Sequence, residues 1–146
     1  MELIRAGLYE LVPVERMSLL SFMELRLAIL GELLVDAEEW KRHCIYDAPY
    51  SAQSPVIQFF WKYVQSLDDS QRLELLRWMT GLHCLPPGGF SSLHQSFRIS
   101  KDFGSTNRLP SVSTCSFALS LPEYDSFELL SAKLGTATAE FSFGRA

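Results

Sequence analysis

The spacing of helix-start signals is the feature of this sequence that most limits its fold. When Ser or Asp is followed three residues later by Glu or Gln, each side chain can accept a hydrogen bond from a free backbone N–H of the other residue, which stabilises a helix start. The pairs with this spacing are Ser21 with Glu24, Asp36 with Glu39, Asp68 with Gln71, and Asp125 with Glu128. We therefore expect a helix to begin at each of them.

Stop signals and apolar spacing predict the extent of these helices. Gly31 and Gly81 each follow an apolar run and are natural helix ends, and a short helix is expected from about residue 36 to residue 43. Ser54 and Pro55 open a further helix, since proline in the first turn has no N–H to lose. Helical spacing predicts a buried face on each of the longer helices. The residues expected on these faces are Leu25, Ala28, Ile29, Ile57, Phe60, Trp61, Val64, Leu75, Leu76 and Met79.

The sequence changes character after Gly81. A stretch rich in Pro and Gly, residues 86–89, precedes short runs at residues 97–99 and 117–121 in which apolar and polar side chains alternate. This period of two indicates half-buried strands. A last helix should begin near Asp125. It should carry Leu129, Leu130, Ala132 and Leu134. The predicted fold class is α+β, with a helical N-terminal half followed by a small sheet with a C-terminal helix.

Composition and charge exclude several classes of protein. The 146 residues, 47% of them hydrophobic and 21% charged, are enough for one domain, or one domain plus part of another. A net charge of −4 with scattered Lys and Arg indicates neither a nucleic acid nor a membrane as partner. The sequence contains no apolar run near the ~20 residues of a membrane span and does not start like a signal peptide. We expect an intracellular location, the cytoplasm first, with the nucleus also open.

Cys115 lies in the stretch RLPSVSTCSFALSLPEY, after a turn rich in hydroxyl groups and before an alternating run that we expect to anchor the turn to a sheet edge. The chain has three cysteines at irregular spacing, which argues against a disulfide framework and for free thiols. Two interpretations stay open at this point. Cys115 is either a buried structural thiol or a nucleophile held at the surface.

Fragments distributed along nearly the whole chain resemble a known family. They are Asp36 to Trp40, Tyr46, Tyr50, Ile57 with Phe60-Trp61, Thr80-Gly81, Gly88-Gly89-Phe90, Arg108-Leu109-Pro110, Thr114-Cys115, Leu121-Pro122-Glu123-Tyr124 and Phe143-Gly144. In this order and spacing they resemble the C-terminal lobe of HECT-type ubiquitin-protein ligases. Residues 8–31, with Pro13, Glu24-Leu25 and Leu30-Gly31, similarly resemble the last helices of that family's N-terminal lobe.

The resemblance implies a division of the chain. Residues 1–30 would be the tail of the N-lobe, residues 34–146 a complete C-lobe, and residues 31–33 (Gly31, Glu32 and Leu33) the interlobe hinge. The residues alone favour a turn inside one core, but a glycine at a helix end also suits a hinge, and the resemblance favours the hinge. The resemblance also implies that most of the N-lobe, with its docking surface for the ubiquitin-conjugating enzyme, is absent from this sequence.

The resemblance further implies a thioester enzyme. Cys115 would accept the C-terminal carbonyl of ubiquitin and pass it to a substrate lysine, supported by Thr114, Arg108 and Phe143. The implied partners are ubiquitin, a conjugating enzyme bound through the N-lobe, and a protein substrate, with no cofactor and no metal. Three positions depart from the family pattern. They are Ser113 and Ser116, where many members have His and Phe, and Cys84, where a basic residue is common.

Other functions are also compatible with single features. His43-Cys44 and His83-Cys84 could be metal ligands, but neighbouring helix residues point about 100° apart and chelate poorly. A Cys/His hydrolase would require Cys115 near His94 or His83 and an orienting group. The main alternative is a fragment without turnover that binds ubiquitin or an N-lobe.

Overall fold

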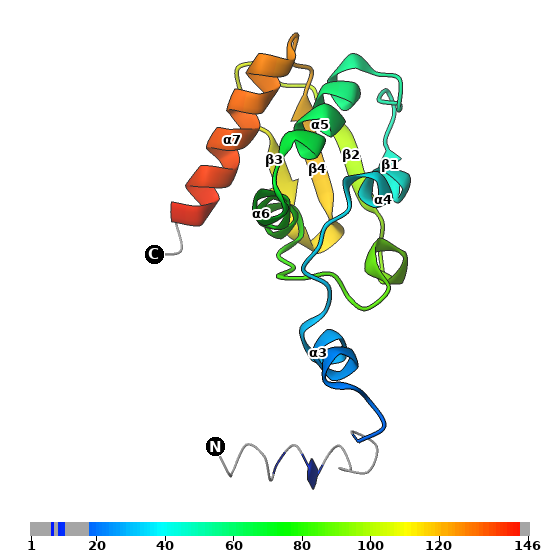
Figure 1. The fold of residues 1–146 in the computed structure, drawn as a ribbon. Coiled ribbons are helices and arrows are strands. Elements are labelled where there is room, and N and C mark those ends of the chain that lie inside the picture. The colour runs from blue at the N-terminus through cyan, green and yellow to red at the C-terminus, as the bar shows by residue number, and fades with distance from the viewer. Residues whose placement is uncertain (1–6, 8, 11–17, 144–146) are drawn as a thin grey trace.

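The computed structural model describes residues 7, 9–10 and 18–143, with the side chains of residues 142 and 143 outside the description. Figure 1 shows a body of helices and strands, with one helix, α3, set apart from it. The elements are α3 (Phe22–Leu30), α4 (Ala37–Arg42), β1 (Cys44–Tyr46), α5 (Pro55–Ser66), α6 (Asp69–Thr80), β2 (Phe97–Asp102), β3 (Ser111–Ser113), β4 (Ala118–Pro122) and α7 (Phe127–Phe143). Two 3₁₀ turns, η1 (Gly89–Ser92) and η2 (Thr114–Ser116), join strands and loops. The predicted α+β class is confirmed.

The four strands form one mixed sheet in the order β1-β2-β4-β3. β1 and β4 both run parallel to β2, and β3 runs antiparallel to β4. Two expectations were therefore wrong. β1 lies inside the half expected to be helical, because three residues are too few to show an alternation. The strand after Cys115, β4, is an interior strand, and β3, which precedes the cysteine, is one of the two edge strands.

One face of the sheet is buried. Phe97, Ile99, Leu119 and Leu121 are fully buried, whereas Arg98 between the first two is exposed. This is the alternation that the sequence predicts for a strand with one buried and one solvent-exposed face. α6 contacts β3, β4 and α7, and α7 also contacts α5. The helices therefore shield the apolar face of the sheet.

Aromatic side chains connect the N-terminal helices to the sheet. The ring of Trp40 on α4 lies 5.1 Å from Phe97, 5.6 Å from Phe90 and 6.1 Å from Trp61, measured between ring centroids. Trp61 on α5 also donates its indole N–H to the Tyr46 hydroxyl at 2.9 Å, which fastens β1 to that helix. All the predicted core residues of α5 and α6 are buried. They are Ile57, Phe60, Trp61, Val64, Leu75, Leu76 and Met79.

Helix ends follow the predicted chemistry in most places. The full reciprocal pair forms at Ser21–Glu24 and at Asp68–Gln71. At α4 only Asp36 acts, accepting from the Glu39 N–H at 2.7 Å. The C-terminal helix is capped differently from the prediction. Ser126, one residue after Asp125, accepts the Leu129 N–H at 3.2 Å, and α7 begins at Phe127.

The helix α3 buries none of its residues against the rest of the described chain. The predicted core face was wrong here, because Leu25 is only half-buried and Ala28 and Ile29 are exposed. Figure 1 shows the physical reason, since α3 stands away from the sheet at the end of an extended segment. Leu8, Pro13 and Gly144, which carry part of the family resemblance, lie outside the described residues. Within the described part, no helix combines the length and apolarity needed to cross a membrane.

Candidate functional site

Cys115 is the middle residue of η2, the turn that joins the edge strand β3 to the interior strand β4. Its side chain is exposed, while Cys44 and Cys84 are only partly accessible. Of the two interpretations of Cys115, the geometry therefore supports the surface thiol. β3 ends where the turn begins and β4 starts just after it, so the two paired strands of the sheet hold both sides of the turn.

Contacts from outside η2 hold the turn. The side-chain amide of Gln95 donates to the Cys115 carbonyl oxygen at 3.0 Å. The Ser116 hydroxyl lies 2.8 Å from the Ser113 hydroxyl and 3.4 Å from the Ser113 carbonyl. These two serines, which depart from the family pattern, form a polar bridge across the turn. α6 packs against the same turn.

Phe117 follows the turn in a left-handed conformation, with φ 48° and ψ 40°. It is the single non-glycine residue with positive φ in the described part of the chain. A bulky residue in this region is strained. Its side chain is nonetheless buried, stacked on Phe97 at 5.5 Å and in edge contact with His94 at 5.4 Å. Burial of the ring therefore offsets the strain beside Cys115.

The predicted supporting residues lie in different places. Thr114 is exposed on η2 beside Cys115, and its carbonyl accepts the long Phe117 N–H bond at 3.5 Å. Arg108 precedes β3, whereas Cys115 follows it. The Arg108 carbonyl accepts a hydrogen bond from the Tyr124 hydroxyl at 2.7 Å, and the Arg108 side chain lies against Gly104. These contacts do not bring the guanidinium to the thiol. Phe143 is the last residue of α7, and its side chain lies outside the described part.

Cys44 and His43 lie in surroundings of their own. Burial, together with the nearby Asp47 carboxylate, raises the pKa of the Cys44 thiol to about 12. The His43 ring is bonded through Nδ1 to the Glu39 carbonyl at 2.9 Å and stacks on Phe90. Across the described residues, no three His, Cys, Asp or Glu side chains are grouped as metal ligands. The structure therefore provides no support for a metal site at His43-Cys44.

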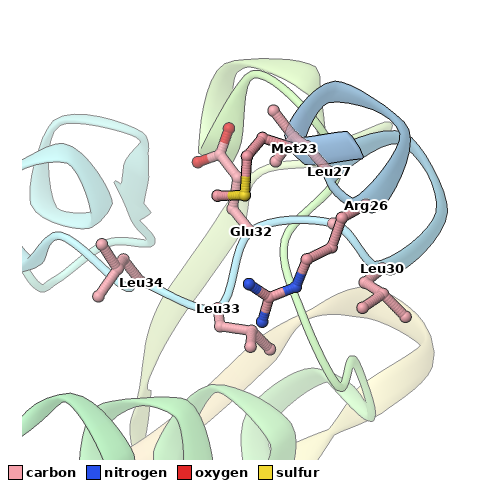
Figure 2. Close-up of a pocket in the computed structure, with 8 residues that line it drawn as sticks. Met23, Arg26, Leu27, Leu30, Glu32, Leu33 and Leu34 are labelled. Atoms are coloured by element: carbon pink, nitrogen blue, oxygen red, sulfur yellow. The ribbon is translucent and has the colours of Figure 1, made fainter. Parts of the chain in front are cut away.

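The predicted hinge, residues 31–33, is tied to the loop before η1. Glu32 and Leu85 exchange backbone hydrogen bonds of 2.7 and 2.9 Å, and the Glu32 carboxylate accepts the Gly88 N–H at 2.9 Å. A pocket of about 340 Å³ opens beside this segment. Figure 2 shows the Arg26 guanidinium next to Leu33, pointing away from the Glu32 carboxylate. The pocket is lined by Met23, Arg26, Leu27, Leu30, Gly31, Glu32, Leu33 and Leu34.

Two residues of the site have no signal in the sequence. Gln95 contacts Cys115 from 20 positions away, and no local pattern marks it. The left-handed backbone of Phe117 is also unexpected, because the alternation of residues 117–121 predicts a regular strand. A positive φ is normally signalled by Gly, Asn or Asp.

The structure thus shows an α+β domain with an exposed cysteine on a turn between two paired strands. Comparison with known proteins identifies the family of this domain. The family model described as HECT-domain (ubiquitin-transferase) matches residues 1–144. The chain therefore belongs to the HECT-domain family.

Individual relatives are similar over almost the whole chain. The chain is 38% identical over 143 residues to the E3 ubiquitin-protein ligase ptr1 of Schizosaccharomyces pombe, covering 94% of this chain and 4% of that protein. It is 37% identical over 142 residues to human E3 ubiquitin-protein ligase NEDD4, covering 94% of this chain and 11% of that protein. It is 38% identical over 143 residues to mouse E3 ubiquitin-protein ligase HUWE1, covering 94% of this chain and 3% of that protein. The chain thus spans a small part of the length of these relatives.

Proposed function

We propose that this chain acts in ubiquitin-protein transfer by forming a ubiquitin thioester on Cys115 and passing the ubiquitin to a lysine amine. Family membership supports the class of reaction. We choose Cys115 as the thioester-forming residue because its side chain is exposed on a turn that is held from both sides. The partners in this proposal are ubiquitin, a conjugating enzyme and a protein substrate.

The proposed chemistry has two steps. In the first, the Cys115 sulfur attacks the thioester carbonyl that joins ubiquitin to the conjugating enzyme, a new C–S bond forms, and the old C–S bond breaks. The leaving thiolate takes up the proton that Cys115 gives up. The two thioesters are of similar stability, so this exchange is nearly balanced. In the second step a lysine amine attacks, and the more stable amide releases the Cys115 thiol.

The domain division also remains part of the proposal. The continuous core begins at Val35, which is 1% exposed, and α3 lies outside it. This arrangement supports a C-lobe over residues 34–146, an N-lobe tail over residues 1–30 and a connecting segment at residues 31–33. The contacts of Glu32 with Leu85 and Gly88 favour a connecting segment with a preferred position over a fully free one.

A non-reducing gel tests the proposed function. The chain is incubated with ubiquitin, ubiquitin-activating enzyme and a conjugating enzyme, with and without a HECT N-lobe in trans. We expect a ubiquitin adduct that thiol reagents remove and that Cys115→Ala abolishes. Cys84→Ala, which removes a half-buried thiol beside Gly31, is the matched control and should load normally. If no adduct forms under either condition, the transferase proposal is wrong, and the result favours the alternative of a fragment that binds ubiquitin or an N-lobe without turnover.

A further inference from the structure

The turn that carries Cys115 makes a poor hydrogen bond of its own. Its internal bond, from the Phe117 N–H to the Thr114 carbonyl, is 3.5 Å long, beyond the 2.7–3.2 Å range of a normal bond between these groups. The backbone that follows is strained at Phe117. The backbone bond inside the turn is therefore weak, and contacts beyond it, including the Ser116–Ser113 hydroxyl pair, contribute to holding Cys115.

Gln95 supplies the one bond from outside the turn to the backbone of Cys115 among the described residues, at a normal length of 3.0 Å. A carbonyl oxygen only accepts hydrogen bonds, so the Gln95 atom facing it is the amide nitrogen. Holding this carbonyl fixes the peptide plane between Cys115 and Ser116. Because this plane contains the Cys115 Cα and carbonyl carbon, holding it restricts the directions in which the Cys115 side chain can leave the turn.

The residue before Gln95 reinforces the same support. His94 places its ring against Phe117, 5.4 Å between centroids, so two consecutive side chains contact the turn on both sides of Ser116. β2, which begins two residues after Gln95, is bonded to β4 along its length. The segment 94–95 is therefore anchored to the same sheet as the turn that it contacts.

We propose that Gln95 is a positioning residue for the nucleophile, holding the Cys115 thiol in the direction from which it attacks a ubiquitin thioester. This inference rests on the proposed function of Cys115 and adds a residue to it. Gln95 touches neither ubiquitin nor the reacting atoms in this role. It acts through the Cys115 carbonyl alone.

The matched variants are Gln95→Met, which keeps the length of the side chain but removes the donor, and Gln58→Met. Gln58 is exposed on α5, so its replacement controls for loss of a surface amide. The acyl donor is ubiquitin carrying a thioester of a small thiol, mercaptoethanesulfonate. Cys115 forms the new C–S bond, the small thiol leaves with its electron pair, and it takes up the proton lost by Cys115. No conjugating enzyme or N-lobe is needed for this step.

We expect Gln95→Met to load ubiquitin about tenfold more slowly than the wild type, since a displacement of a reacting group by about 1 Å can cost about 100-fold. Gln58→Met should load like the wild type. Alkylation of Cys115 by iodoacetamide, followed by peptide mass spectrometry, should stay within about twofold, because a small electrophile approaches from many directions. Amide hydrogen exchange of residues 114–117 should be faster in Gln95→Met.

Each other outcome is decisive. If the wild type loads and Gln95→Met loads equally well, the positioning role is wrong while the proposed function stands. If alkylation slows as much as loading, Gln95 affects the thiol itself, and the positioning role is again wrong. If the wild type forms no adduct, the proposed function fails, and amide exchange alone tests whether Gln95 holds the turn. Unchanged exchange at residues 114–117 in Gln95→Met would then show that it does not.

Discussion

Glu32 and Leu85 exchange a pair of backbone hydrogen bonds, 2.7 Å from the Glu32 N–H and 2.9 Å from the Leu85 N–H. The bridge joins the segment after α3 to the loop that follows α6. It places Gly31 so close to this loop that a Cβ atom on residue 31 would lie 2.3 Å from the Leu85 carbonyl oxygen. The position of α3 relative to the body therefore depends on a glycine.

Gly31→Ala should break this bridge. Gly31 has φ 73° and ψ −171°, a region that costs a residue with a side chain about 1–3 kcal/mol, and the new methyl group would also collide with backbone. We expect amide exchange of Glu32 and Leu85 to accelerate at least tenfold, measured by NMR. Unchanged exchange at both amides would show that the segment adapts without losing the bridge.

Two other glycines separate the causes of this effect. Gly81 also has positive φ, 75°, but a Cβ atom there would meet nothing within 4 Å. Gly81→Ala should therefore destabilise by strain alone, about 1 kcal/mol. Gly135 lies inside α7 with open space around it and no positive φ. Gly135→Ala should stabilise the protein by about 1 kcal/mol, and thermal unfolding of both variants checks the signs.

Local signals predicted most of the helical framework. The pair Asp68–Gln71, Pro55 in the first turn of α5 and the stop at Gly81 all act through backbone groups within a few residues, although the Ser54 side chain makes no cap bond. Such signals are complete in the sequence, because donor and acceptor are close neighbours along the chain. Both α5 and α6 were predicted correctly for this reason.

The predictions were wrong or incomplete where the local structure depends on residues far away in the sequence. β1 is a strand because Cys44 to Tyr46 pair with β2, more than 50 positions away, and three residues carry no period. The buried face expected on α3 failed because amphipathic spacing does not say whether a partner surface is present. Gln95 was missed because its bond to Cys115 depends on how two loops meet after folding. The sequence alone pointed to Cys115 through its neighbours, but not to what holds it.

The two thiols Cys44 and Cys115 should differ strongly in reactivity. Burial and Asp47 raise the pKa of Cys44 to about 12, so at pH 8 roughly one Cys44 side chain in 10,000 is a thiolate, the reactive form. We expect limiting iodoacetamide at pH 8 to modify the exposed Cys115 well before Cys44. Peptide mass spectrometry over a time course measures both. Equal rates would show that the surroundings of Cys44 open readily in solution.

The same raised pKa of Cys44 predicts how the free energy of unfolding changes at alkaline pH. The folded chain holds the Cys44 proton more tightly than the unfolded chain, whose thiol pKa is about 8.5. The contribution is therefore complete below about pH 8.5 and is lost as the pH rises towards about 12. Urea unfolding from pH 8 to 10 should show falling stability, and Cys44→Ala should show a shallower fall. An identical slope in both proteins would contradict the prediction.

Phe117→Ala tests whether burial of this ring holds the Cys115 turn. The side chain is 4% exposed and packs on Phe97 and His94, so its truncation should cost about 3 kcal/mol. Relief of strain offsets little of this cost, because Ala at φ 48° is also strained. Phe117→Gly removes both the ring and the strain, and should be more stable than Phe117→Ala. The reverse order, measured by urea unfolding, would show that the backbone is not strained there.

Phe143→Ala should separate the two steps of the proposed reaction. The family resemblance assigns this residue to the transfer step, so the variant should load ubiquitin on Cys115 at the normal rate and discharge it to free lysine about tenfold more slowly. Phe141→Ala is the matched control. Phe141 is partly buried against the core, so its loss should lower the melting temperature instead. Loading is timed first, and discharge is timed after the donor is quenched. Discharge at the wild-type rate from Phe143→Ala would remove this residue from the proposed site.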